Sequence, residues 1–583
     1  MLTRSRLWTL LPLTGLLLLL GSRVGQATPS ASPPAALTQR LATFAQVWGF
    51  LKYHHPGMAR PHLDWDSVLV RQLPQVQAAR TPAAFHVQVA RLLSVLGPPP
   101  TTARAVPPEL LPRNVDVGWL THDPLLSPAL RQQLMQLWQQ HAFPAVHPTV
   151  TETAAGLLEH HERAYPDMVL PAEAYRLLTL FRYWNIIQYY YPYKYAIGTP
   201  WPSVLRTFIP RFQQATTAPA YHLLVLELVA QLHDTHAFLY GSTVLSAQLG
   251  DYYPPLELTQ LEGQVVVAQV YRDATPAVLP VQVGDVVLQA NGVAVQQILT
   301  RYQPYVAAST PAALQRDLLR FVLRGQAQDS LALTVRTRTG VRTVRLARSL
   351  SILSLRSASY KTYFFGMNPR DTTHLWRRFG YLHLGGLQET QLPSVLPQLA
   401  RTRGLILDLR AYPSASVGSL LAALPPAAAP VRRLGLRADS VAAIGWARST
   451  VPTLTYPGYT RWTPLATLAP STRRPASYPG QVVVLVNEKT QSYGETLAML
   501  LQARPGVVIV GSQTAGANGN IVPVPLPGGL ETYYSGVGMY YPDGGETQRR
   551  GIVPNLVVTP TVAGLQAGRD EVLDRAVAYL QQP

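Results

Sequence analysis

The 583-residue chain contains no cysteine. This absence excludes disulfide bonds, thiol nucleophiles and a lipid-modified cysteine at the end of a signal segment. Charged residues are also scarce, at 14% of the chain against 47% hydrophobic residues, and such a composition excludes an intrinsically disordered polypeptide. At roughly 100 to 200 residues per domain, the length predicts about three to five folded units.

Acidic residues are few relative to basic ones, since 31 Asp and Glu face 49 Lys and Arg and the formal net charge is +18. The arginines are scattered, and the chain has no long Lys/Arg run and no nucleic-acid-binding motif. Solvated basic faces are therefore the favoured interpretation, and we expect no nucleic-acid partner. Weak attraction to an anionic cell envelope stays open as an alternative.

Long apolar runs are missing except near the start of the chain. Arg4 and Arg6 precede an apolar stretch at 7–20, and the small residues Gly25 and Ala27 follow it. The stretch is shorter than the roughly 20 residues that span a bilayer, so it predicts a signal peptide, residues 1–27, rather than a membrane anchor. We expect an exported protein, periplasmic or extracellular, with no stable membrane span after cleavage.

A repeat at an offset of 136 positions marks the first half of the chain. The matched residues include Trp48 and Trp184, Tyr53 and Tyr189, Pro56 and Pro192, and Trp65 and Trp201. Apolar residues at i, i+3, i+4 and i+7 within 225–232 predict a helix in the second copy. We expect duplicated helical units at 28–97 and 170–248, separated by a proline-rich linker region at 98–169 with one short helix near 130–140.

The two copies differ where they end. The second copy ends with His233-Asp234-Thr235-His236, and the matching positions of the first hold Gly97-Pro98-Pro99-Pro100, which cannot continue a helix. Only the second copy can therefore carry chemistry at this point. Two histidines and an aspartate so close together also suggest zinc, but no further ligand follows at a matching spacing, so we expect no metal and no cofactor.

Short β-rich runs fill residues 251–349. Within them, the segment VGDVVLQANGVAV at 283–295 has a Gly-Asp turn that leads into a strand and an Asn-Gly turn that follows it. This segment resembles the core of a PDZ domain. The resemblance implies a fold in which a peptide adds as a strand to a sheet edge and backbone amides hold its terminal carboxylate. A plain β-rich spacer is the alternative.

Strands alternate with helices from residue 355 to residue 583. The apolar runs at 404–409, 482–487 and 507–511 have the length of buried strands, and a helix is expected at 493–502. This pattern predicts an α/β core.

Ser492 lies between the second of these strands and that helix. A serine at such a junction is a candidate nucleophile, because the helix dipole and the N-terminal amides favour negative charge there. The sequence from Ser492 to Glu495 also fits a capping box, in which the serine only caps the helix and the glutamate bonds back to it. The motif alone leaves both interpretations open.

Four sequence blocks in the late part of the chain carry a family resemblance. They are LILDLRAYP at 405–413, VVVLVNEKTQSYGE at 482–495, VVIVGSQTAGANG at 507–519 and PDGGETQRRGIVPN at 542–555. With the PDZ-like segment before them, they resemble C-terminal-processing and tricorn-like serine peptidases over about residues 170–575. The resemblance implies a multidomain α/β protein with a crotonase-like catalytic core, a protein or peptide substrate, and Ser492 as nucleophile.

The resemblance also implies a base. One branch of the family uses a lysine within T-x-G-K-G, but this chain has Ala517 at the lysine position, so a Ser/Lys pair is excluded. The tricorn-like branch has a histidine far upstream in a D-x-H-like sequence, which His236 matches. We therefore expect an exported serine endopeptidase in which His236 takes the proton of Ser492.

The remaining catalytic positions depart from the family pattern. Gln548 stands where an acidic residue supports the histidine, Glu546 is the nearby acidic alternative, and Thr235 is a candidate second hydroxyl partner. The family implies the amide of Tyr493 as the first oxyanion donor, and the altered turn at 411–415 leaves the second donor open. These departures support an alternative, an inactive protein that binds a peptide or a lipophilic ligand on the same fold. A third possibility is an interaction module built on the helical repeats.

Overall fold

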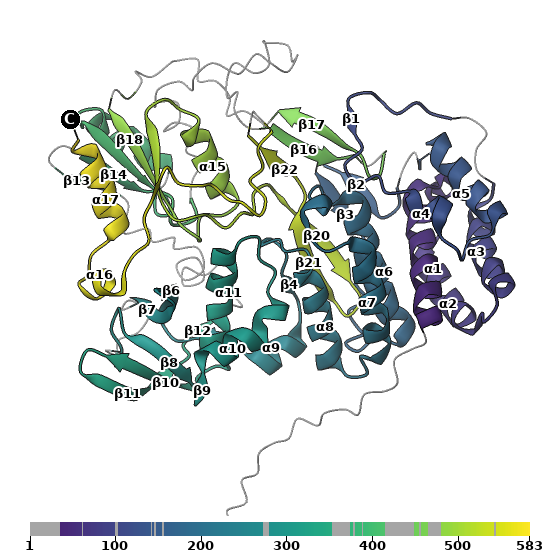
Figure 1. Ribbon diagram of the computed structural model, residues 1–583, viewed down its shortest axis with the longest axis horizontal. Helices are drawn as coiled ribbons and strands as arrows, with labels where there is room; N and C mark the ends of the chain where they lie inside the picture. Colours follow the sequence, from purple (N-terminus) through teal and green to yellow (C-terminus); the bar gives the residue numbers. More distant parts are fainter. Residues whose placement is uncertain are drawn as a thin grey trace, which may run out of the picture.

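The computed structural model describes residues 35–582 in part. The positions outside its description within that range are 61, 99–102, 142, 145–146, 154–156, 272–278, 352–372, 377–378, 388, 414–447, 454–455, 465–477, 479 and 542–543. The predicted signal peptide lies outside the described residues. Where the chain is described, no helix is both long enough and apolar enough to cross a membrane. The fold is mixed α/β, with helices at one end and sheets at the other (Figure 1).

Helices dominate the first 250 residues. They are α1 (Ala35–His54), α2 (Trp65–Ala78), α3 (Pro82–Leu96), α4 (Gly118–His122), α5 (Pro128–Gln140), α6 (Glu173–Tyr190), α7 (Trp201–Gln214), α8 (Ala218–Ala230) and α9 (Thr243–Leu249). Helices α2 and α7 start 136 positions apart and both have 14 residues, and α3 and α8 also start 136 positions apart.

Equivalent tryptophans hold the first two helices of each copy together. Trp48 Nε1 donates to the carbonyl of Trp65, and Trp65 Nε1 donates to the carbonyl of Trp48, each at 3.2 Å. Trp184 and Trp201 make the same reciprocal pair at 2.9 and 3.0 Å. Each buried indole N–H thus has an acceptor on the other helix, so neither donor is left unpaired by burial.

The two copies meet at Gly49 and Asn185, which are also 136 positions apart. Asn185 Nδ2 donates to the carbonyls of Ala45 and Phe181, so the amide spans α1 and α6. A Cβ atom on Gly49 would lie 1.9 Å from the side chain of Asn185. A glycine is therefore required in α1 for the helices to approach this closely.

The short helix predicted near 130–140 is present as α5 (Pro128–Gln140), and the region at 98–169 holds further elements beyond the expected linker. This region contains α4, α5 and the strands β1 (Leu110–Leu111), β2 (Val150–Glu152) and β3 (Leu158–His160). Leu130, Leu134 and Leu137 of α5 are buried in the same core as the helical copies, because they share one face of that helix. Pro128 stands in the first turn, where its missing N–H costs nothing, so the proline content did not prevent a helix.

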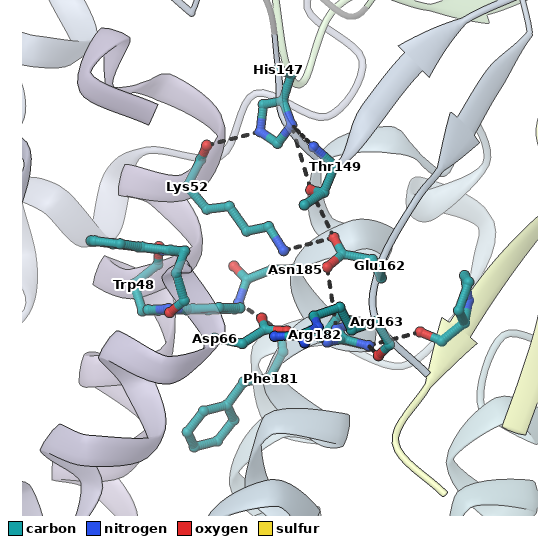
Figure 2. Close-up of polar contacts among 12 residues, drawn as sticks. Trp48, Lys52, Asp66, His147, Thr149, Glu162, Arg163, Phe181, Arg182 and Asn185 are labelled. Carbon is teal, nitrogen blue, oxygen red and sulfur yellow. Dashed lines mark hydrogen bonds and ion pairs between the residues drawn. The ribbon is translucent and has the colours of Figure 1, made fainter. Parts of the chain in front are cut away.

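A buried network of charged side chains lies between the helical copies (Figure 2). Lys52 Nζ lies 2.6 Å from Glu162 Oε1, and both side chains are 1% exposed. Arg182 contacts Asp66 at 2.5 Å and the other Glu162 oxygen at 3.4 Å. Burial alone would raise the pKa of Glu162, but Lys52 and Arg182 outweigh it and hold the pKa below its usual value. Glu162 is therefore an ionised carboxylate inside the protein.

An antiparallel sheet follows, in the order β11-β10-β8-β7-β6 with β9 beside β8. The elements of this unit are β5 (Tyr252–Tyr253), β6 (Leu256–Leu261), β7 (Gln264–Val270), β8 (Val286–Ala290), β9 (Val293–Ala294), α10 (Val295–Tyr302), α11 (Pro311–Leu323), β10 (Ser330–Thr337), β11 (Gly340–Ala347) and β12 (Leu350–Ser351). Asn291 and Gly292 turn the chain between β8 and β9 with φ values of 49° and 77°. The Asn-Gly turn predicted at this point is therefore present.

A largely parallel sheet forms the late core, in the order β13-β14-β15-β18-β19-β23. Its elements are β13 (Thr373–Trp376), β14 (Phe379–His383), α13 (Leu392–Leu399), β15 (Gly404–Asp408), β18 (Gln481–Val486), α15 (Tyr493–Gln502), β19 (Val507–Gly511), β23 (Leu556–Val557), α16 (Val562–Gln566) and α17 (Glu571–Leu580). Apolar side chains of the central strands are buried on both faces, against α15 on one side and α17 on the other.

Besides the two-stranded pairs β2-β3 and β5-β12, two smaller sheets join parts of the fold. One contains β1, β16 (Arg448–Pro452), β17 (Thr460–Pro464) and β22 (Gly538–Tyr540). The other has the order β20-β21-β4 and joins β4 (Leu239–Tyr240) to β20 (Ile521–Leu526) and β21 (Leu530–Ser535). Val522, Val524 and Tyr534 are buried in the helical core, so this sheet packs against the repeats (Figure 1). The two halves of the chain are thereby joined.

Candidate active site

Ser492 has an unusual backbone conformation at the start of α15. Its φ and ψ angles are 55° and −119°, a region that residues other than glycine rarely adopt. The N–H of Ser492 donates to the carbonyl of Ala517 at 2.8 Å, and its side chain makes no capping bond to the helix. Ser492 Oγ instead lies 3.4 Å from the carbonyl oxygen of Gly519. A strained turn between a strand and a helix is typical of a serine nucleophile.

The capping-box interpretation is wrong for Ser492, whose side chain makes no capping bond, and Glu495 has a wider set of contacts. Its carboxylate accepts from the hydroxyl of Thr514 and from the N–H groups of Gly516 and Ala517, the latter two at 2.8 and 3.0 Å. Burial raises the pKa of Glu495 to about 7, against the effect of these hydrogen bonds. Glu495 therefore holds the loop that accepts the N–H of Ser492, and it also has a hydrogen bond to the backbone of Ser492.

The strand β15 ends next to this turn. Arg410 bridges Asp408 at 2.6 Å and Asp570 of α17 at 2.7 Å, which fixes the Asp-Leu-Arg sequence as a structural ion pair. Thr490 Oγ1 donates to the carbonyl of Leu409 at 2.7 Å. The chain after β15 is thus held against the loop that carries Ser492.

Tyr412 follows β15 and was not predicted as a site residue. Its side chain makes hydrogen bonds with the side chain of Ser492 and with the backbone of Tyr493. Burial raises the pKa of Tyr412, and these two bonds oppose the rise. The phenol therefore stays protonated near neutral pH and can donate a hydrogen bond. Ser414 and Ala415, the end of the predicted oxyanion turn, lie outside the described residues.

His236 is joined to a buried carboxylate through a serine. His236 Nδ1 lies 2.8 Å from Ser535 Oγ, which donates to Asp234 Oδ1 at 3.0 Å. The N–H groups of Ser535 and His236 also donate to Asp234, at 2.8 and 3.1 Å. A carboxylate can only accept, so the Ser535 hydroxyl must in turn accept from Nδ1–H. Nε2 of the neutral ring then carries no proton, and this is the form that a general base needs.

Three influences set the pKa of His236. Burial lowers it from its ordinary value, the charge of Asp234 opposes that shift, and Arg316 lowers it further. The imidazole is therefore neutral at neutral pH. Among the described residues, no group of three or more His, Cys, Asp or Glu side chains is arranged to hold a metal ion.

The three predicted partners of His236 are all bonded elsewhere. Gln548 Nε2 donates to Tyr191 and Ser309, Glu546 accepts from Tyr195, and Thr235 Oγ1 donates to Ala515 and accepts from Ser309. Within the part of the chain that is described, none of them has a hydrogen bond to His236. The partner of His236 Nδ1 is Ser535 instead, and a catalytic role for Gln548, Glu546 or Thr235 stays a prediction.

Ser492 and Thr235, the residue before His236, contact a common loop at 514–519. This loop accepts the N–H of Ser492, and its Ala515 carbonyl lies 3.4 Å from the hydroxyl of Thr235, which precedes His236. The described contacts include no hydrogen bond between Ser492 and His236. Such catalytic hydrogen bonds are often long before substrate binds and tighten afterwards.

The chain matches one family of known proteins. Residues 378–558 match the family model of Peptidase family S41. This range contains Ser492 and Ser535 but begins long after His236, which the match does not include. The predicted resemblance to C-terminal-processing and tricorn-like peptidases is confirmed. No curated protein sequence matches the chain.

Several solved structures have a similar fold. Mature CPAF has a TM-score of 0.52 and 17% identity, over 70% of this chain and 98% of CPAF. Mature CPAF complexed with lactacystin has a TM-score of 0.51 and 16% identity, over 70% of this chain and 99% of that one. The photosystem II D1 C-terminal processing protease has a TM-score of 0.36 and 16% identity, over 66% and 93% of the two chains.

Proposed function

We propose, from the premise that this S41-type chain is a serine-type peptidase, that Ser492 is its nucleophile and His236 its general base. His236 Nε2 takes the hydroxyl proton while Ser492 Oγ attacks the carbonyl carbon of a peptide bond. The protonated imidazole then donates to the leaving nitrogen, and the C–N bond breaks. Water, deprotonated by the same ring, hydrolyses the acyl-enzyme and restores the Ser492 hydroxyl.

The hydrogen-bonded chain from His236 through Ser535 to Asp234 is the observation that carries this proposal. It supplies both the Nδ1–H tautomer and a negative charge near the imidazolium that forms during attack. In this protein, Asp234 replaces the family's acidic residue, whose position Gln548 occupies. The amide Gln548 is therefore compatible with turnover, and its presence no longer favours an inactive binding protein.

The oxyanion would be held by the hydroxyl of Tyr412 and by the N–H of Tyr493, which would exchange its present bond to the Tyr412 side chain for one to the oxyanion. Pro413 has no N–H, so a side-chain donor is needed where the family uses a glycine-rich turn.

We expect Tyr412→Phe to lower kcat about ten-fold to a hundred-fold with little change in KM, because it removes one oxyanion donor. Steady-state hydrolysis of a fluorogenic peptide measures this. Tyr478→Phe, which removes a hydroxyl bonded to Thr402, should leave kcat unchanged.

The unit at 251–349 is proposed to bind the C-terminal part of the substrate in the manner of a PDZ domain. It contacts the loop before the nucleophile, since Arg316 Nη1 donates to the carbonyl of Glu488 at 2.7 Å and Nη2 to Gln491 at 3.1 Å. Lys489 also pairs with Glu257 of β6 at 2.5 Å. A peptide held on this unit would therefore lie close to Ser492. Export through the signal peptide, and a protein substrate outside the cytoplasm, belong to the same proposal.

Labelling with a fluorophosphonate probe tests the nucleophile. We expect the full chain to be labelled covalently and Ser492→Ala to be unlabelled, because the probe reacts only with an activated serine. Cleavage of an unfolded protein, followed on a gel, should be lost in the same variant. Equal labelling of both proteins would refute the assignment, and tight peptide binding without labelling or cleavage would favour the binding-protein alternative.

A further inference from the structure

The sheet β20-β21-β4 has one face in the core and one face outside. Val522, Val524 and Tyr534 point into the helical core, so the alternate residues of β20 and β21 lie on the opposite face. On β21 these are Glu531, Tyr533 and Ser535. Because Ser535 bonds to His236, this outer face begins at the proposed base.

The chain after His236 continues along the same face. Phe238 stacks on Tyr533 with ring centroids 4.6 Å apart, and Tyr240 pairs in register with Glu531. Ala237 is buried and Leu239 packs against the helical core, as the two-residue period of a strand requires. Phe238 is 46% exposed and Tyr240 is 50% exposed, so two aromatic side chains face solvent beside the proposed active site.

The strand β20 extends this surface on the other side of β21. Ile521 pairs with Ser535 and Pro523 pairs with Tyr533. Ile521 is 42% exposed, although it lies directly across from the serine that holds His236. We call Phe238, Tyr240, Ile521, Pro523 and Tyr533 the aromatic face. Exposed apolar side chains gathered next to a reactive centre are typical of a binding surface.

The edge of β20 is not suited to take up a peptide as an added strand. Pro523 and Pro525 have no N–H, and proline is found in strands where the missing N–H points away from the ladder. A peptide would therefore lie across the outer face and contact it with side chains. At roughly 3.3 Å per residue in extended chain, the Phe238–Tyr533 pair is about two residues from the His236–Ser535 pair, and Tyr240 is about four residues away.

We propose that the aromatic face binds aromatic or large apolar side chains of an extended polypeptide substrate, about two and four residues to one side of the bond that is cut. This inference rests on the proposed function, because it takes Ser492 and His236 as the reacting groups. It assigns the substrate class as unfolded chain rich in aromatic residues, which native proteins keep buried.

Two fluorogenic peptides of equal length and charge test the proposal. One carries Phe or Tyr two and four residues from the cleaved bond on either side, and the other carries Ser at those positions. We expect the full-length enzyme to cleave the aromatic peptide with at least about ten-fold higher kcat/KM, since one aromatic contact contributes on the order of a factor of ten. Phe238→Ala and Tyr240→Ala should each reduce this preference, and the double variant should abolish it.

The controls separate this inference from the proposed function. Val341→Ala changes an apolar side chain that is 61% exposed on β11, and it should keep the preference. Phe238→Leu keeps a large apolar side chain at the position, and it replaces the alanine variants in this test if they do not fold. The rate of fluorophosphonate labelling should be the same in all variants, because the probe does not reach the aromatic face. A labelled enzyme with equal kcat/KM for both peptides, or with a preference unchanged in folded Phe238 and Tyr240 variants, overturns the inference. An unlabelled wild-type enzyme that cleaves neither peptide overturns the proposed function.

Discussion

Asp234→Asn is expected to lower kcat for peptide hydrolysis by about a hundred-fold to a thousand-fold. The substitution removes the charge that stabilises the imidazolium of His236. The new amide can also donate to Ser535, which would turn the hydroxyl proton towards Nδ1 and leave the ring proton on Nε2. Stopped assays with a fluorogenic peptide measure kcat, and a melting curve shows whether the buried position still folds.

The pH profile distinguishes this positioning role from a structural one. Because the charge of Asp234 raises the pKa of His236, its loss should move the acid limb of kcat/KM to lower pH while the plateau falls. Ser535→Ala interrupts the same chain and should reduce kcat in the same direction. Gln548→Ala should change kcat less than about three-fold, because Gln548 bonds to Tyr191 and Ser309. A larger loss in Gln548→Ala than in Asp234→Asn would contradict the assignment.

Lys52→Met is expected to lower the free energy of unfolding by about 3–5 kcal/mol. The variant leaves the Glu162 carboxylate buried with a weakened set of partners, and breaking one member of a buried ion pair has a cost of this size. Urea unfolding followed by tryptophan fluorescence measures the change. Arg569→Met, which breaks an exposed pair with Glu571, should cost less than about 1 kcal/mol.

A fall in pH should lower the stability of the protein through the same buried network. The folded-state pKa of Glu162 is lower than that of the unfolded chain, so its contribution is complete above pH 4.5 and is lost as the pH falls through the folded-state pKa. The wild type should therefore lose more stability than Lys52→Met between pH 5 and pH 3. Parallel curves for the two proteins would show that Lys52 does not lower the pKa of Glu162.

Local signals in the sequence pointed to the proposed nucleophile but not to its supporting residues. The helix predicted at 493–502 is α15, and Ser492 stands directly before it, because strand, turn and helix are all encoded within one short block. Ser535 has no such block. It reaches His236 only because β21 pairs with β4, and that register depends on packing against the repeats.

Composition was misleading in the region at 98–169. Its prolines indicated a linker with one short helix, but Pro128 stands in the first turn of α5, and the leucines of α5 complete the core. The Lys52–Glu162 pair could not be predicted from the sequence either, since neither residue belongs to a motif and each is buried only by elements distant in the chain. Tyr412 was not predicted because the turn at 411–415 was assessed only for backbone N–H donors, and its lack of glycines drew attention away from the side chain.

The sheet that joins β4 to β21 has a consequence for biosynthesis. On the proposed assignment, a ribosome makes His236 and the aromatic strand more than two hundred residues before Ser492, and Ser535 comes later still. No unfinished chain can therefore digest its neighbours inside the cell. Proteolysis has to wait until the last strands of the polypeptide have folded back onto the second repeat.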